Sequence, residues 1–156
     1  MARQRHYWLF KSEPAEYGIV DLAGEPGGTA RWDGIRNYQA RNHIRDGVAS
    51  GDGVLIYHSS CKVPGIAGTA TVSGEPYPDP SQFDPDSPYF DPKSTPDKPR
   101  WYSVDIRHQR TFAQLIPATR LKDMAQLADM ILFRQGRLSI QPVTEQHWAI
   151  IMDIAG

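Results

Sequence analysis

The stretch RWDGIRNYQARN, residues 31–42, places arginines, side-chain amides, a tryptophan and a tyrosine close together. Guanidinium groups bind phosphates, and carboxamides can pair with the edges of nucleobases. Asn37 either caps the helix expected after it or uses its amide on a base edge. Arg36, Arg41 and Arg45 either form the solvated edge of that helix or hold phosphates beside a base pocket.

Other polar side chains cluster where predicted strands end, and barrel mouths are places where small ligands often enter. A lysine there could anchor a phosphate and a serine could bind a base edge, although an ordinary turn before Pro14 or a structural histidine is the plainer alternative. Alternation along a strand would put Ser139 and Gln141 on one face together. These candidates are Lys11, Ser12, Tyr57, His58, Ser59, Ser139 and Gln141.

The chain has 156 residues, which predicts one domain spanning 1–156. Its net charge of −1 excludes a polycation, so any attraction to phosphate must come from a local patch. The single cysteine, Cys61, excludes an intrachain disulfide and a zinc site built on a cysteine pair, so no metal and no cofactor is expected. Without a signal peptide or an apolar run long enough for a membrane span, we expect a cytoplasmic protein.

The elements that must position these side chains follow from apolar periodicity and from breakers. Strands are predicted at 6–12, 52–60, 65–75, 100–116 and 137–143, and the glycines of 65–75 indicate a bulge or close packing against a neighbour. Helices are predicted at 16–25, from Asn37 to Gly47, at 119–133 with one break, and after a Thr144 cap. Short strands interrupted by helices without regular βαβ alternation predict an α+β fold, a small mixed barrel or a strongly curved sheet flanked by helices.

Residues 76–99 differ from the rest in composition. They hold eight of the thirteen prolines and five aspartates, which predicts an extended surface loop. The loop also carries four aromatic residues, Tyr77, Phe83, Tyr89 and Phe90. They could dock a protein partner, which would make the chain an interaction module, but we favour the interpretation that they pin the loop to the sheet.

Seven motifs resemble, in order, those of the EVE domain. They are YWLFKSEP at 7–14, WDGIRNYQARN at 32–42, GDGVLIYHSS at 51–60, GIAGTATV at 65–72, DPKS at 91–94, PRWYSVDI at 99–106 and GRLSIQPV at 136–143. The resemblance implies a PUA-like β-barrel related to the YTH and ASCH domains, and a module that binds DNA or RNA carrying a modified base.

Trp32 is a core residue by position alone, since a tryptophan between a turn and a helix usually packs inside. The resemblance favours another role, because the tryptophan of YTH readers also follows a first strand ending in Lys-Ser, here Lys11 and Ser12. Trp32 would then stack on a base taken out of its helix, in an aromatic-lined pocket.

A hydrolase acting on a modified nucleoside is the second hypothesis, since the ASCH domains include amidohydrolases. Lys11, Ser12, Glu13 and His58 include groups that could act as base or nucleophile. The sequence contains no triad motif, no zinc-deaminase spacing and no P-loop, so binding without catalysis is the prediction.

Overall fold

One long strand connects most of the sheet. The structure is a computed structural model that describes residues 4–156, so the start of the N-terminal segment, where no signal peptide was expected, lies outside the described residues. β6 (Tyr102–Pro117) pairs with β2 (Thr29–Trp32), β4 (Gly65–Val72) and the two-residue β5 (Tyr77–Pro78). β3 (Gly53–His58), β1 (Tyr7–Ser12) and β7 (Ile140–Val143) complete the order β2-β6-β4-β3-β1-β7.

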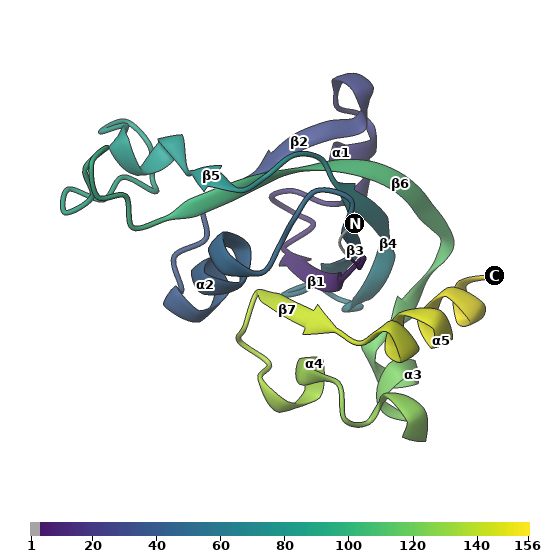
Figure 1. Cartoon of the computed structure of the whole chain (residues 1–156). Coiled ribbons are helices and arrows are strands. Elements are labelled where there is room, and N and C mark those ends of the chain that lie inside the picture. The colour runs from purple at the N-terminus through teal and green to yellow at the C-terminus, as the bar shows by residue number, and fades with distance from the viewer. Residues whose placement is uncertain (1–3) are drawn as a thin grey trace.

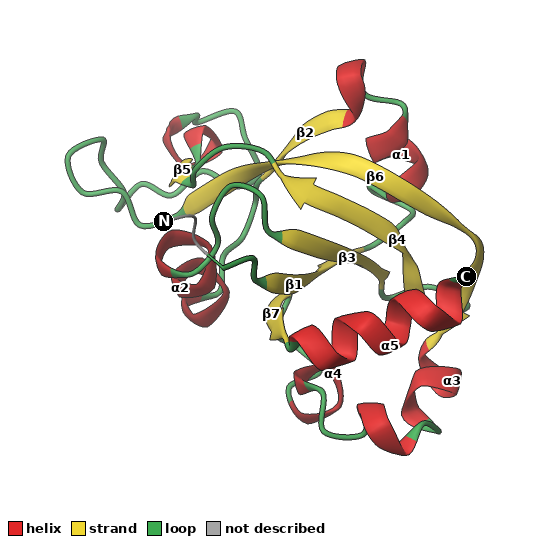
Figure 2. Ribbon diagram, turned by 45° about the vertical axis from the view of Figure 1, so that its right-hand side comes forward, coloured by secondary structure: helices red, strands yellow, loops and turns green. Residues whose placement is uncertain are grey.

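The sheet is strongly curved, as Figures 1 and 2 show, and its pairs are antiparallel except for β1 with β3. It is not a closed barrel, because β2 and β7 end the hydrogen-bonded path of the described strands without pairing with each other. The predicted α+β fold with a strongly curved sheet flanked by helices is confirmed, and the barrel that was its alternative is corrected to an open curved sheet. Pro142 fits this arrangement, since proline is tolerated in a strand at the edge of a sheet.

Close packing of β4 on β6 explains the glycines of β4. A Cβ built on Gly65 or Gly68 would lie 2.2 Å from a carbonyl oxygen of β6, that of Ile116 or of Arg110. The register between the two strands also shifts between Ile66 and Gly68. Both observations confirm the expected bulge and close approach, and an irregular ladder of this kind bends the sheet.

Residue alternation divides the core between the two faces of the sheet. Phe10 and Ile56 belong to one buried cluster, with α1 (Ile19–Ala23) and α2 (Tyr38–Asp46) packed on it. Leu9 and Tyr57, one position away on the same strands, belong to the other. That second cluster also receives the buried side chains of α3 (Ala118–Lys122), α4 (Ile131–Arg134) and α5 (Glu145–Ala155). Figure 2 shows these three helices gathered at one end of the molecule.

The helices after Asn37 and Thr144 are confirmed, and each of these residues accepts a hydrogen bond on its side chain at the helix N-terminus. The helix predicted at 119–133 with one break is divided further than expected. The segment forms α3, a 3-10 turn (Ala125–Leu127) and α4, with Leu121, Leu127 and Leu132 as their buried anchors. Helical spacing would put Ala125 and Ala128 on the face of Leu121, but both alanines are exposed. Packing on the sheet therefore overrode the local helical pattern.

The Pro/Asp-rich loop 76–99 contains β5 and a 3-10 turn (Pro80–Phe83) and projects beyond the sheet near the start of β6 (Figure 1). Gln82 is fully buried there and its hydrogen bonds hold the loop together. Its amide donates to the carbonyls of Asp79 and Trp101, each at 2.8 Å, and its oxygen accepts from Ser94 and the backbone of residues 100 and 101. The loop is thus fixed at its base rather than merely extended.

Candidate nucleic-acid interface

A cleft of about 1010 Å³ lies where the end of β1, the connection from β2 to α2 and the segment before β7 meet. Of the predicted site residues, the structure brings seven to its wall. They are Lys11, Ser12, Trp32, Arg36, Asn37, Ser59 and Ser139. Known ligand sites have volumes of about 300–1,000 Å³, so the cleft is large enough for a nucleotide.

Trp32 is both a core residue and part of the cleft wall. Only 7% of its surface is exposed, and its ring centroid lies 5.8 Å from that of Phe10. Tyr17 approaches edge-on at 6.1 Å, with an interplanar angle of 79°. The phenol of Tyr17 donates to Oε1 of Glu25 at 3.0 Å, and burial, followed by this carboxylate, raises its pKa. The indole is therefore fixed from two sides before any ligand arrives.

Ser12 provides a buried hydroxyl group in the cleft wall. Its Oγ is buried and has no hydrogen-bond partner among residues 4–156. Such a group costs free energy in the folded protein, so it needs an explanation. A hydroxyl can donate and accept at once, and the edge of a bound base would satisfy it.

Lys11 ties the end of β1 to the segment before β7. Its Nζ donates to the carbonyl of Gly136 and lies 5.5 Å from the centroid of the Tyr57 ring. Burial lowers the pKa of Lys11. The same lysine also lines a second cavity of about 270 Å³, together with Tyr57. Lys11 thus lines both cavities.

Tyr57 and His58 do not line the main cleft. Tyr57 faces the second core cluster, as alternation along β3 requires. Nε2 of His58 accepts a hydrogen bond of 3.1 Å from the backbone N–H of Ile19, at the start of α1. Burial lowers the pKa of His58, which agrees with a neutral ring that accepts. The structural alternative for this histidine therefore fits its contacts.

Gln141 supports the cleft from behind. It is buried, and its Nε2 donates to the carbonyls of Gln135 at 3.2 Å and Leu138 at 2.9 Å. Of the pair Ser139 and Gln141, only Ser139 lines the cleft, and β7 begins after it, at Ile140. Gln141 fixes the preceding segment, from which Gly136, Arg137 and Ser139 line the cleft.

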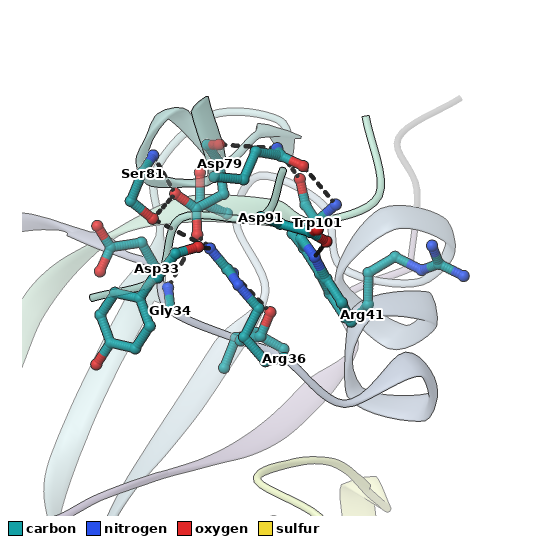
Figure 3. Close-up of polar contacts among 12 residues, drawn as sticks. Asp33, Gly34, Arg36, Arg41, Asp79, Ser81, Asp91 and Trp101 are labelled. Carbon is teal, nitrogen blue, oxygen red and sulfur yellow. Dashed lines mark hydrogen bonds and ion pairs between the residues drawn. The ribbon is translucent and has the colours of Figure 1, made fainter. Parts of the chain in front are cut away.

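Arg36 fastens the cleft to the Pro/Asp-rich loop (Figure 3). Its guanidinium donates to Oδ2 of Asp79 at 3.0 Å, to the hydroxyl of Ser81 at 3.3 Å and to the carbonyl of Tyr89 at 2.7 Å. Burial alone would raise the pKa of Asp79, but hydrogen bonds from Ser81, Gly34 and Arg36 lower it. Asp79 is therefore an anion held inside a polar network.

Arg41 and Arg45 lie on α2 and do not line the cleft. Arg41 donates to the carbonyl of Arg100 at 2.8 Å, and Arg45 pairs with the exposed carboxylate of Asp46 at 2.8 Å. Asn37 caps α2 through its side-chain oxygen, which accepts from the backbone N–H of Ala40 at 2.9 Å, and its side chain also lines the cleft. Phosphate binding by Arg36, Arg41 and Arg45 stays a prediction, and their contacts favour structural roles.

Sequence reasoning missed several cleft residues. Arg31 and Arg137 add cations to the wall, whereas Glu16, Glu25 and Asp33 add carboxylates beside Glu13, which was considered only for the hydrolase hypothesis. Arg31 pairs with Asp33 at 3.0 Å. Tyr17 and Tyr89 were missed as well. Arg31 opens the stretch 31–42, but nothing local in the sequence marks Arg137 or Tyr89 as residues of the same cleft as Trp32.

Within residues 4–156, no three His, Cys, Asp or Glu side chains are grouped as metal ligands would be. None of the helices there has the length and apolar character needed to cross a bilayer.

Comparison with known proteins agrees with the fold and motifs. Residues 6–154 match the EVE domain. Human thymocyte nuclear protein 1 is 39% identical over 95% of this chain and 73% of its own length. A Pseudomonas putida protein of known crystal structure is 48% identical, with a TM-score of 0.91 over 96% of this chain and 99% of its own. The human THYN1 protein in complex with 5-methylcytosine-containing DNA has a TM-score of 0.91 and 38% identity, covering 96% of this chain and 97% of that one.

Proposed function

Because the chain belongs to the EVE domain family, we propose that it binds DNA carrying a modified base and takes that base into the cleft beside Trp32. The complex of the human relative with 5-methylcytosine-containing DNA supports the choice of polymer and of ligand class. The finer part of the proposal, that the modified base enters the cleft lined by Trp32, depends on the geometry of this chain.

The buried hydroxyl of Ser12, in the wall of the cleft that Trp32 also lines, is the observation that carries the proposal. A base removed from its stack needs an aromatic face to cover it and donors or acceptors for its edge. Trp32 supplies a ring that is already fixed, and Ser12 supplies a polar atom without a partner among residues 4–156. Ser139 and the amide of Asn37 lie in the same wall.

Phosphate groups next to the extruded base require cations at the mouth of the cleft. Lys11, Arg31 and Arg137 line it, and the side chain of Arg31 is 45% exposed. The overall net charge is only −1, so this local group, rather than a general attraction, would hold the strand.

The hydrolase hypothesis receives less support, because the residues that suggested it have other partners. Nε2 of His58 is occupied by the N–H of Ile19, and Nζ of Lys11 by the carbonyl of Gly136. Ser12 and Glu13 line the cleft, but Oγ of Ser12 has no hydrogen-bond partner among residues 4–156, so no described base activates it as a nucleophile. We therefore propose binding as the function.

A titration series tests the proposal. Oligonucleotides of one sequence would carry cytosine, 5-methylcytosine or other modified bases at one position, in single- and double-stranded DNA and in RNA. We expect tighter binding to one modified DNA, and loss of that preference in a folded Trp32→Leu variant. Equal affinity of the wild-type protein for modified and unmodified oligonucleotides would contradict the proposal, and a preference for RNA would correct the polymer.

A further inference from the structure

Tyr89 is an exposed aromatic residue at the edge of the cleft. It belongs to the Pro/Asp-rich loop, yet it lines the same cleft as Trp32. Its surface is 41% exposed, whereas Trp32 is 7% exposed. An exposed ring in the wall of a nucleic-acid site can stack on a base.

The position of Tyr89 is fixed by its neighbours. The guanidinium of Arg36 lies 5.4 Å from the ring centroid and also donates to the carbonyl of Tyr89 at 2.7 Å. Gly34 packs against the ring so closely that an added Cβ would lie 2.7 Å from it. Gly34 also has a φ of +75°, which favours glycine. Contacts with Arg36 and Gly34 thus hold Tyr89 in place before any ligand binds.

Arg36 is itself held by Trp101. Its guanidinium lies 5.3 Å from the ring centroid of Trp101, and Trp101 stacks on Tyr38 at 4.8 Å. The indole N–H of Trp101 donates to Oδ2 of Asp91 at 2.7 Å, and Figure 3 shows Arg36 between this tryptophan and Asp79. Tyr89 is therefore one end of a row formed by its ring, the guanidinium of Arg36 and the rings of Trp101 and Tyr38, and it is the end that lines the cleft.

We propose that Tyr89 stacks on the nucleobase next to the one that enters the cleft, so that the site binds two consecutive nucleotides. This inference rests on the proposed function. An ordered, solvent-exposed ring loses little conformational entropy on binding, and it tolerates any base because every base has a planar face. Trp32 would then determine which modified base is preferred, and Tyr89 would add affinity that does not depend on the modification.

Abasic ligands separate stacking from other effects. Binding would be measured for the preferred modified oligonucleotide, intact or with an abasic site on the 5′ or the 3′ side of the modified base. Tyr89→Ala should weaken binding to the intact oligonucleotide roughly 5- to 150-fold. One of the two abasic ligands should weaken wild-type binding by a similar factor and should not weaken Tyr89→Ala further.

Two control variants complete the experiment. Tyr89→Phe keeps the ring and should bind like the wild type. Phe90→Ala removes the neighbouring ring of the same loop, which is 40% exposed but does not line the cleft, and should also leave affinity unchanged. Melting curves of every variant establish that each is folded.

The failure of this inference differs from the failure of the proposed function. If the wild type prefers the modified oligonucleotide and folded Tyr89→Ala binds it equally well, Tyr89 is not a stacking residue. If Tyr89→Ala weakens binding by the same factor with and without the neighbouring base, the residue only supports the cleft, and the inference is again overturned. If the wild type shows no preference for any modified oligonucleotide, the proposed function fails and the inference falls with it.

Discussion

At the scale of single residues, Ser12 and His58 face the same side of the sheet and occupy paired positions of β1 and β3, yet their environments differ. The side chain of His58 accepts a backbone hydrogen bond, whereas Oγ of Ser12 has no partner within residues 4–156. A satisfied group stabilises the fold and an unsatisfied one destabilises it. Substitutions at the two positions should therefore act in opposite directions.

Ser12→Ala should stabilise the free protein and weaken ligand binding. Removing an unsatisfied buried hydroxyl should raise the free energy of unfolding by up to about 2 kcal/mol, and losing its bond to the base should cost about 0.5–1.5 kcal/mol of affinity. Denaturant unfolding and oligonucleotide titration check the two effects. Ser59→Ala is the matched control, because its hydroxyl lies in the same cleft but already donates to the carbonyl of Ser12 at 3.4 Å. A less stable Ser12→Ala with unchanged affinity would show the hydroxyl to be structural.

His58 should make the protein less stable in acid. Burial lowers its pKa, so the unfolded chain binds the proton more tightly than the folded one. Its contribution is fully present above the ordinary histidine pKa of about 6.5 and is lost as the pH falls through the lower folded value. His58→Gln can still accept from Ile19 but cannot titrate. Melting temperatures from pH 8 to pH 5 should fall less steeply for this variant than for the wild type, and parallel curves would contradict the assignment.

The failure to predict which of Tyr57, His58 and Ser59 line the cleft has a simple cause. Consecutive residues of a strand point to opposite faces, and Tyr57 directly follows Ile56, which belongs to the first core cluster. Alternation counted from Phe10 and Ile56 would have placed Tyr57 on the far face without any structure. His58 could not be assigned in the same way, because its partner, the backbone of Ile19, lies 39 residues earlier in the chain.

At the scale of elements, the Pro/Asp-rich loop shows how buried polar groups give order to a segment without regular structure. Asp79 is fully buried and accepts from Gly34, Arg36 and Ser81. The composition of 76–99 predicted a loop on the surface, and this is confirmed. Its internal order could not be predicted, because the partners of Asp79 and Gln82 include residues just before β6 and before α2, which only the fold brings close.

Asp79→Asn should loosen this loop. The substitution keeps the shape of the side chain but removes the charge that Arg36 and two backbone N–H groups face, at a cost of about 1.5–3 kcal/mol. Backbone amides of 76–99 should exchange with deuterium faster, while those of β3 and β4 keep their protection relative to global unfolding. Asp97→Asn, an exposed position in the same loop, should change neither. Unchanged exchange in Asp79→Asn would show that Gln82 alone holds the loop.

At the scale of the whole molecule, the motifs and their order predicted the fold, but the cleft is assembled from segments distant in sequence. Ser12, Trp32, Tyr89 and Ser139 come from four separate regions of the chain. Periodicity finds which residues are buried and in which element, and it cannot show which loops meet. The resemblance supplied Trp32, while Arg137 and Tyr89 required the three-dimensional structure.

Removal of residues 144–156 should abolish cooperative unfolding if the chain is one domain. Ile151 of α5 is fully buried in the second core cluster, and Trp148 lies 4.5 Å from the Tyr7 ring of β1. Arg110 of β6 also donates to the carbonyl of Ala155 at 3.0 Å. Calorimetry and denaturant titration should show a broad transition or none. An unchanged, sharp transition in the truncated protein would make α5 a peripheral element.

β6 lies between β2 and β4 in the sheet, and this position also determines the order in which the protein can fold during synthesis. β2 and β4 are made well before residues 102–117, yet both take β6 as a neighbour in the sheet. Until β6 leaves the ribosome, β2 has no strand to pair with and one edge of β4 stays open, although β1, β3 and β4 can already associate. Open edges of nascent sheets pair readily with other chains. Completion of β6 is therefore the step that covers the open edge of β4 and gives β2 its partner, while the outer edge of β1 stays open until β7 is made.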